Sequence, residues 1–359
     1  MGIEERIREL EEKLEETPVN KATETERGRL KGQIAKLEEE KQKKQKSTGD
    51  TTGYAVKKQG DATVALVGFP SVGKSTLLNK LTNAEVDTGA YEFTTLEVNP
   101  GMLEHNGAKI QILDVPGLIG GAADGRGDGT QVLSVVRNAD LVMIVLDPEE
   151  YRYKEITDEL HKAGIRIDKE PPRIKIEKKD RGGINISGEN RLKFGKETAK
   201  QLMKDNGYRN AEAIIRENQV DMDRFIDALM DNRKYVPSLT VLNKKDKAED
   251  ISEFEEVEKA ISAVNEEGMG ELKDAIFAKM GLVRVYMKEK GEEPDKDDPL
   301  ILREGDTVQK ALDKLPGDMD RRFKKAKVTG PSSKFPEQKI GKEHVLKDED
   351  VLQLNLKHL

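Results

Sequence analysis

The sequence predicts an α/β fold built on a parallel sheet with crossover helices. Near-continuous apolar segments, typical of strands buried on both faces, occur at 62–68, 108–117, 139–147 and 238–246. Helix-forming segments separate the first three, which is the order of a doubly covered parallel sheet. A glycine-rich loop directly follows the first apolar segment. The length of 359 residues allows two or three domains at roughly 150 residues each.

The composition excludes several classes of protein. Charged residues make up 36% of the chain, and it contains no cysteine. Disulfides, zinc–thiolate sites, iron–sulfur clusters and a cysteine nucleophile are therefore excluded. No apolar segment approaches the ~20 residues that span a bilayer, and the N-terminus lacks a signal-peptide pattern. We therefore expect a cytoplasmic protein with no membrane partner.

The charge distribution bears on nucleic-acid binding. The net charge is −7, and residues 61–282 hold 31 basic and 40 acidic residues. An acidic centre argues against simple coating of a nucleic acid, although local basic patches remain able to bind one. We expect no DNA partner.

Residues 1–60 are expected to form an N-terminal helical hairpin. Thr17-Pro18 interrupts a helical pattern, and a polar, basic linker is expected at 41–53. Such a hairpin is either a solvated arm or an arm that docks on a partner. The apolar positions of its two helices are Ile3, Ile7, Leu10 and Leu14, then Leu30, Ile34 and Leu37.

The α/β alternation is interrupted once. We expect a central domain at 61–164 and 237–282, an inserted α+β subdomain at 165–236, and a compact α+β unit at 283–359. In the insert, strands precede three expected helices at 196–207, 208–218 and 221–230. The C-terminal unit shows short strands and one helix starting near Asp306 or Thr307.

The glycine-rich loop matches the phosphate-binding pattern G-x-x-x-x-G-K-[ST] between a strand and a helix. Its backbone N–H groups and the helix N-terminus suit phosphate oxygens. Lys74 is expected to reach the β- and γ-phosphates, and the Ser75 hydroxyl to bind Mg²⁺. The expected nucleotide-binding residues here are Gly68, Pro70, Ser71, Val72, Gly73, Lys74, Ser75 and Thr76.

A second motif, Asp114-Val-Pro-Gly117, follows the next apolar segment. An aspartate at this place can hold Mg²⁺, usually through water, and the Gly117 amide can sense a γ-phosphate.

A third motif, Asn243-Lys-Lys-Asp246, ends the last of these strands. A carboxylate at Asp246 can accept two hydrogen bonds from guanine, which favours guanine over adenine. Asn243 is expected to tie this loop to the phosphate-binding loop, and the stem of Lys244 to cover one face of the base. Ser262-Ala263, expected to follow a helix at 253–260, can present backbone amides to the guanine oxygen. The 129 residues from Asp114 to Asn243 are long for this fold and match the proposed insertion.

With these motifs in place, the chain resembles the Obg-type translation-factor GTPases, and within them the developmentally regulated GTP-binding branch of archaeal type. The resemblance covers nearly the whole chain and rests most on GFPSVGKSTLLNKLT and YEFTTLEVNPG. It implies a Ras-like G domain with an insert like ribosomal protein S5, and a C-terminal TGS domain of β-grasp fold.

The resemblance also implies further site residues. Thr95 would be the switch threonine that closes on Mg²⁺ and the γ-phosphate. With Lys74 and Gly117 it completes the expected catalytic set, and with Ser75 and Asp114 the expected Mg²⁺ ligands. Leu118 stands where many GTPases carry a water-orienting Gln, so slow intrinsic hydrolysis is expected. K⁺ is a further expected cofactor, although Ser71 stands where the best-understood potassium-dependent relatives carry Asn.

The leading functional hypothesis is a Mg²⁺-dependent GTPase that binds GTP and GDP and acts as a switch on ribosomes, rRNA or tRNA. A regulatory protein partner is also expected. The alternative is a constitutive ribosome- or RNA-binding scaffold with a largely structural G domain. An ATPase or small-molecule kinase is opposed by Asp246. Two basic patches, 173–181 and 321–327, are candidates for phosphate contacts to folded RNA.

Overall fold

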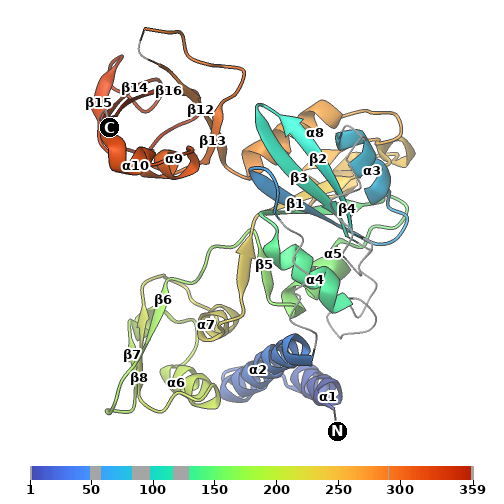
Figure 1. The fold of residues 1–359 in the computed structure, drawn as a ribbon. Coiled ribbons are helices and arrows are strands. Elements are labelled where there is room, and N and C mark those ends of the chain that lie inside the picture. The colour runs from blue at the N-terminus through green and yellow to red at the C-terminus, as the bar shows by residue number, and fades with distance from the viewer. Residues whose placement is uncertain (1, 49–57, 83–97, 116–128, 290, 357–359) are drawn as a thin grey trace. The chain divides into compact units, whose positions relative to one another are not determined.

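The computed structural model describes residues 2–48, 58–82, 98–115, 129–289 and 291–356 (Figure 1). The chain divides into two compact units. One combines the described residues within 1–54, 120–137 and 157–236, and the other those within 55–119, 138–156 and 237–359. In the part of the chain that is described, no helix is long and apolar enough to cross a membrane.

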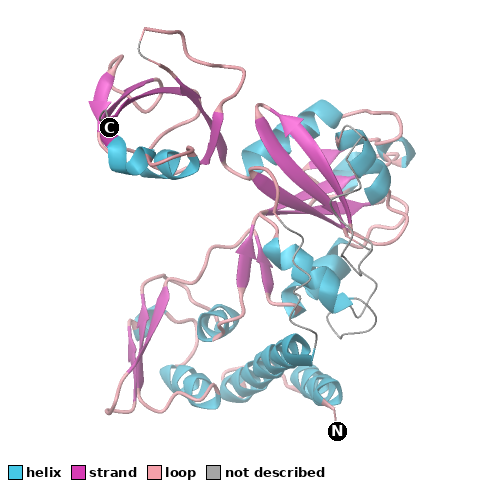
Figure 2. Cartoon of the chain, in the orientation of Figure 1, coloured by secondary structure: helices cyan, strands magenta, loops and turns pink. Residues whose placement is uncertain are grey.

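The central sheet of the second unit has six strands in the order β11-β10-β4-β1-β3-β2. Figure 2 draws the strands of the described residues in magenta and the helices in cyan. All six pair in parallel except β2, an edge strand that the sequence analysis missed and that runs antiparallel to β3. The predicted parallel sheet therefore carries one antiparallel strand at this edge. The strands are β1 (Ala62–Val67), β2 (Asn99–His105), β3 (Ala108–Asp114), β4 (Leu141–Leu146), β10 (Ser238–Leu242) and β11 (Lys259–Ala260).

The buried positions of this sheet explain its apolar sequence. Every residue of β1, β4 and β10 is buried. The helices α3 (Lys74–Leu81) and α8 (Met269–Lys279) pack on it, whereas α4 (Gly129–Asn138) begins in the first unit. The expected helix at 253–260 is wrong, because this segment holds a 3-10 turn at Ile251–Glu253 and then the short strand β11.

The N-terminal hairpin consists of α1 (Ile3–Glu16) and α2 (Glu24–Thr48), separated at the expected break. The linker expected at 41–53 was wrong in part, since α2 continues to Thr48. Lysine and glutamine propagate a helix well, and polarity alone does not end one.

The insert folds as a three-stranded sheet in the order β6-β8-β7 with two helices. Its elements are β6 (Ile174–Lys178), β7 (Ile184–Ser187), α6 (Lys196–Asp205), β8 (Ala211–Ile215) and α7 (Met222–Leu229). The helix expected at 208–218 was wrong, because β8 lies there and pairs with both neighbouring strands. Its buried residues Ala211, Ala213 and Ile215 alternate with half-buried ones, which is the period of a strand.

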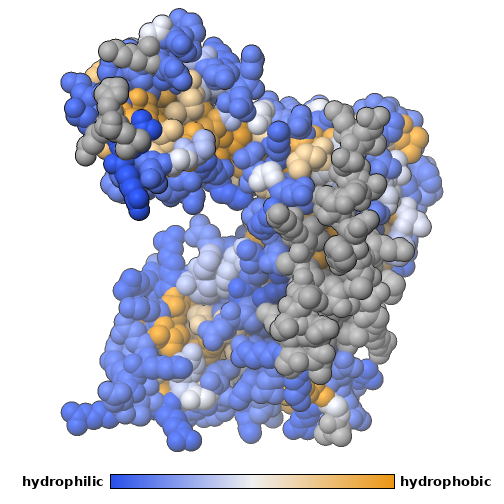
Figure 3. Space-filling model, viewed as in Figure 1, coloured by the Kyte–Doolittle hydropathy of each residue, from blue (hydrophilic) through white to orange (hydrophobic). Residues whose placement is uncertain are grey.

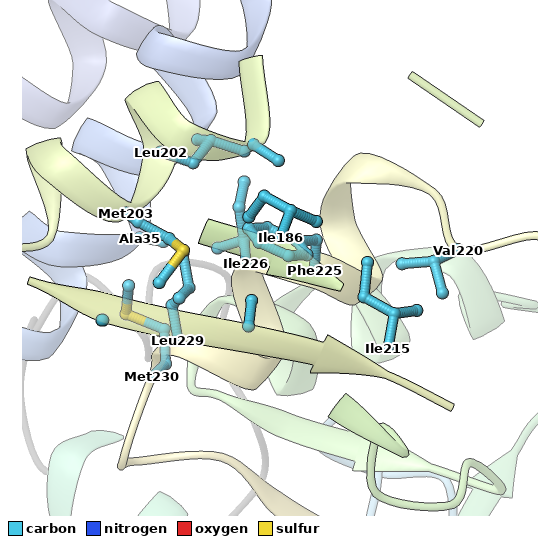
Figure 4. Packing of buried hydrophobic residues seen from close by; sticks show 13 residues of the cluster. Ala35, Ile186, Leu202, Met203, Ile215, Val220, Phe225, Ile226, Leu229 and Met230 are labelled. Atoms are coloured by element: carbon cyan, nitrogen blue, oxygen red, sulfur yellow. The ribbon is translucent and has the colours of Figure 1, made fainter. Parts of the chain in front are cut away.

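The α2 helix docks on the insert of the same chain, so the arm is not a freely solvated one, and docking on a partner stays a prediction. Ala35 lies in the hydrophobic cluster formed by α6, α7 and the sheet (Figure 4). Close approach is possible because two glycines face α6: a Cβ added at Gly28 would lie 2.9 Å from Thr198 Cγ2, and one at Gly32 3.0 Å from Leu202 Cδ2. Lys31 Nζ also donates to Asp223 Oδ1 at 2.7 Å.

Buried charges fix the base of the insert. The strands β5 (Ile165–Ile167) and β9 (Lys234–Val236) pair in parallel where the chain enters and leaves it. Arg166 donates two hydrogen bonds to Asp227 of α7, at 2.7 and 2.8 Å, and Arg233 donates a third at 2.7 Å. Burial alone would raise the pKa of Asp227, but Arg166 and Arg233 together hold it below its usual value.

The C-terminal unit is a five-stranded sheet in the order β13-β12-β16-β14-β15, with two short helices. The strand β14, which carries part of the patch 321–327, and β15 were not predicted. The elements are β12 (Leu282–Met287), β13 (Leu300–Arg303), α9 (Val308–Lys314), α10 (Met319–Arg322), β14 (Phe323–Thr329), β15 (Gln338–Ile340) and β16 (Asp350–Leu356).

The glycine contact between α2 and α6 leads to a stability prediction. Gly32→Leu should destabilise the protein by about 1–3 kcal/mol, because the larger side chain overpacks the contact with Leu202. This outweighs the gain in helix propensity of under about 1 kcal/mol. Urea unfolding followed by circular dichroism measures the change.

Glu40→Leu is the matched control, because it places the same side chain at an exposed position of α2. We expect a change within about 0.5 kcal/mol there. Equal stability of the Gly32→Leu variant and the unmodified chain would show that α2 is not held against α6.

Candidate functional site

The candidate site lies where the parallel strands of the central sheet have their carboxyl ends. Because β1, β3, β4 and β10 are parallel, their carboxyl ends meet there. The glycine-rich loop follows β1, Asp114 ends β3, Asp147 follows β4 and Asn243 follows β10. Ligands of open α/β sheets bind outside the carboxyl ends of the strands. The fold therefore brings together the described parts of all three sequence motifs.

The glycine-rich loop needs its two glycines for different reasons. At Gly68 a Cβ would lie 2.5 Å from the Val145 carbonyl oxygen, so only glycine fits against β4. Gly73 has φ +92°, and a Cβ there would lie 2.4 Å from Asn243 Nδ2. Ser71 also adopts a left-handed conformation, with φ +66°. The loop is thus held in a conformation that turns directly into α3.

Lys74 and Ser75 open α3 and face the rest of the site. Lys74 is buried, and its Nζ donates to the carbonyl oxygens of Gly68 and Phe69 at 3.1 and 2.9 Å. Burial lowers the pKa of this ammonium group, and the Asp114 carboxylate opposes the shift. Ser75 Oγ donates to Asp114 Oδ2 at 2.5 Å, so the first and second motifs are in contact.

Asn243 connects the third motif to the first. Its Nδ2 donates to the Val72 carbonyl oxygen at 2.9 Å, which is the tie to the phosphate-binding loop that the sequence analysis predicts. Its Oδ1 accepts the Ala263 amide at 3.0 Å. Asn243 is only 2% exposed, so one buried side chain joins three loops.

Lys244 lies over the same loop, and its partner was not predicted. Its Nζ donates to the Ser71 carbonyl oxygen at 2.8 Å and to Asp147 Oδ2 at 2.5 Å. Asp147, 6% exposed, is a residue of the site that the sequence reasoning missed. The signal was present, because Asp147 directly follows an apolar strand, as Asn243 does.

Ser262 acts on the ionisation of Asp246. A hydrogen bond from the Ser262 side chain holds the pKa of the Asp246 carboxyl below its usual value. The Ser262 amide donates to the Glu267 carbonyl oxygen at 3.2 Å, and the Ala263 amide already donates to Asn243. Both amides expected for the guanine oxygen therefore have partners within the loops.

Some of the remaining predicted site residues are described by the structure and others are not. Pro70, in the loop, and Thr76, in α3, are exposed, and Val72 is buried. Thr95, Gly117 and Leu118 lie outside the described residues, so their predicted roles stay predictions.

Comparison with protein-family models covers most of the chain. Residues 63–179 match the 50S ribosome-binding GTPase model, 181–282 match the C-terminal region of that domain, and 283–355 match the TGS domain. Fold and site together define a GTP-binding protein with a P-loop G domain and a C-terminal TGS domain.

Full-length relatives identify the family. An uncharacterized GTP-binding protein of Halobacterium salinarum is 47% identical over 99% of both chains. The developmentally-regulated GTP-binding protein 1 homolog of Dictyostelium discoideum is 41% identical over 99% of both chains. Developmentally-regulated GTP-binding protein 1 of Xenopus laevis is 40% identical over 98% of this chain and 99% of its own. The chain belongs to the family of developmentally regulated GTP-binding proteins.

The contacts of Asn243 lead to a prediction on nucleotide affinity. Asn243→Ala should weaken GTP and GDP binding by about tenfold or more, because the Val72 carbonyl and the Ala263 amide both lose a buried partner. Titration with a fluorescent guanine nucleotide measures the change. Asn185→Ala, at an exposed position of the insert, is the control and should bind as the unmodified chain does. Full affinity in the Asn243→Ala variant would contradict the assigned role.

Proposed function

We propose that the protein hydrolyses GTP to GDP and phosphate with Mg²⁺ and uses this cycle as a switch on ribosomes or ribosome-associated RNA. The observation that carries the proposal is the link made by Asn243, which holds the phosphate-binding loop and the loop of Asp246 and Ser262 at one edge of the sheet. A site built this way suits a ligand with a phosphate chain at one end and a guanine at the other.

Ser75 and Asp114 fit a Mg²⁺ ion. They contribute a hydroxyl and a carboxylate oxygen within 2.5 Å of each other, and hard oxygen ligands are those that Mg²⁺ prefers. We propose that these two residues and Thr95 hold the ion. When bound, Mg²⁺ would neutralise charge on the phosphate oxygens. A K⁺ ion is a further proposal. Ser71 stands where the best-understood potassium-dependent relatives carry Asn, so this position offers a hydroxyl in place of an amide.

The phosphates are assigned to the loop and its lysine. The ammonium of Lys74 now donates to two carbonyl oxygens of its own loop, and phosphate oxygens are stronger acceptors than these carbonyls. We assign the γ-phosphate to Lys74, Thr95 and the Gly117 amide. With Leu118 in the position of a water-orienting Gln, intrinsic hydrolysis would be slow.

The base is assigned to the third motif. Ser262 lowers the pKa of Asp246, and the ionised carboxylate would accept hydrogen bonds from the guanine ring nitrogen and amino group. The stem of Lys244 would cover one face of the base, while its Nζ stays with Asp147. The Ala263 N–H already donates to Asn243 Oδ1, so it would have to be shared between that oxygen and the guanine oxygen.

The domain division is part of the same proposal. We assign 61–164 and 237–282 to the G domain, 165–236 to the insert, 283–359 to the TGS domain and 1–60 to the arm. A shared core of α6, α7 and the three-stranded sheet supports the insert as a folding element. A cytoplasmic location and a regulatory protein partner are likewise proposed.

Exchanging the base-reading carboxylate tests the nucleotide assignment. Asp246→Asn should lower GTP binding and hydrolysis by about tenfold or more, since each hydrogen bond to a charged group contributes about 1.5–3 kcal/mol. The same variant should gain activity with xanthosine triphosphate, because an amide can donate to the oxygen that replaces the amino group. Phosphate release with both nucleotides measures this. Unchanged preference for GTP would remove Asp246 from the site.

Cosedimentation with purified ribosomes tests the switch. We expect the chain to pellet with ribosomes in the presence of a non-hydrolysable GTP analogue and not with GDP. The family model's description as a 50S ribosome-binding GTPase supports this expectation. In the Lys74→Ala variant, which loses the phosphate-binding lysine, the amount that pellets with ribosomes should not depend on the nucleotide. Equal pelleting of the unmodified chain with analogue, GDP or no nucleotide would instead favour the constitutive scaffold.

A further inference from the structure

Two basic patches stand out in the sequence, and the structure shows that they differ in how far their charges are paired. In the patch 173–181, Lys175 pairs with Glu177 at 2.7 Å, and Lys179 pairs with Glu212. The outward positions of β6, β7 and β8 carry one lysine and two glutamates: Lys175, Glu177, Asn185, Ser187, Glu212 and Ile214. This face of the insert neutralises its own charge.

The outward face of the C-terminal sheet is different. Strand register places the buried cluster on one face and the alternate residues of β12, β16, β14 and β15 on the other. No carboxylate occupies these alternate positions, because Asp350, the acidic residue of β16, is on the buried face. The outward residues are Leu282, Arg284, Tyr286, Val351, Gln353, Asn355, Lys325, Lys327, Thr329 and Lys339. Leu282 is buried and Arg284 pairs with Asp348 and Glu349, so the positive charge that this face leaves unneutralised lies on its lysines.

Two lysines of this face repel each other. Lys327 and Lys339 stand directly opposite each other on β14 and β15, where like charges destabilise a sheet. Glu337 pairs with Lys327 at 2.7 Å and offsets one of the two charges. Among the described residues, no ion pair is recorded for Lys325 or Lys339. The three lysines keep a net positive charge after the pairing with Glu337, and repeated positive charge fits a ligand with repeated negative charge.

We propose that this outward face of the TGS sheet binds the sugar–phosphate backbone of a folded RNA, with Lys325, Lys327 and Lys339 as the phosphate contacts. The proposal deepens the RNA part of the proposed function and rests on it. Gln353 lies opposite Lys327 and Asn355 opposite Lys325, so amide groups that can bond 2′-hydroxyls lie between the charges.

The same face argues for backbone contacts rather than base stacking. Sheets that stack single-stranded bases present two or three aromatic rings, and this face presents one, Tyr286. The bound RNA is therefore read by charge and shape, with little sequence preference and strong dependence on salt.

A matched pair of double variants of the full chain tests the proposal. The first is Lys325→Ala with Lys339→Ala, and the control is Lys175→Ala with Lys179→Ala in the insert. The probe is a fluorescently labelled, folded tRNA transcript, titrated by anisotropy at several salt concentrations. Each variant is also titrated with a fluorescent GTP analogue, which reports whether the G domain is intact.

The first double variant should bind the tRNA about tenfold more weakly near 0.1 M salt, and the slope of log affinity against log salt should fall by about 2. The control should change affinity less than about twofold, with both variants binding the GTP analogue normally. Full tRNA affinity in the first variant, or an equal loss in the control, overturns the proposal. Tighter binding of poly-L-glutamate than tRNA by the unmodified chain overturns the choice of RNA. Failure of the unmodified chain to bind or hydrolyse GTP is the separate result that contradicts the proposed function.

Discussion

The nucleotide site depends on one buried amide. Asn243 donates to the carbonyl of Val72 and accepts from the amide of Ala263, so three loops from distant parts of the sequence are joined by a single side chain. Gly73 leaves room for this amide, since any Cβ there would collide with it. A rigid sheet edge brings the loops near one another, and the amide then fixes their separation. The span from the phosphate-binding loop to Asp246 is thereby set before any ligand binds.

The same need for close approach shapes the first unit. Gly28 and Gly32 let α2 lie against α6, and Ala35 completes the core of the insert. At the base of the insert, three arginine hydrogen bonds hold the buried Asp227. Leaving the buried Asp227 carboxylate without these partners would lower the stability of the fold. The hydrogen bonds therefore hold β5, the start of β9 and α7 together in the folded insert. The surface stays largely hydrophilic, as the face in Figure 3 shows, consistent with a charged fraction of 36%.

Much of this structure could be predicted where one signal dominates. Apolar runs located β1, β3, β4 and β10, and the motifs that follow them converge because parallel strands end at one edge. Prediction failed where signals compete. The segment around Ala211 to Ile215 has helix-forming residues but pairs with strands on both sides, and tertiary pairing decided its state. Asp147 directly follows an apolar strand, but its partner, Lys244, is 97 residues away, so the sequence did not show with which group it pairs.

The docking of α2 on α6 also sets a lower limit on when the first unit can fold during synthesis. Residues 24–48 leave the ribosome long before residues 196–205, which form their partner. At ~5–20 residues per second, the side of α2 that packs on α6 waits on the order of ten to thirty seconds for its partner. The docking of α2 can therefore be completed only after α6 has been synthesised.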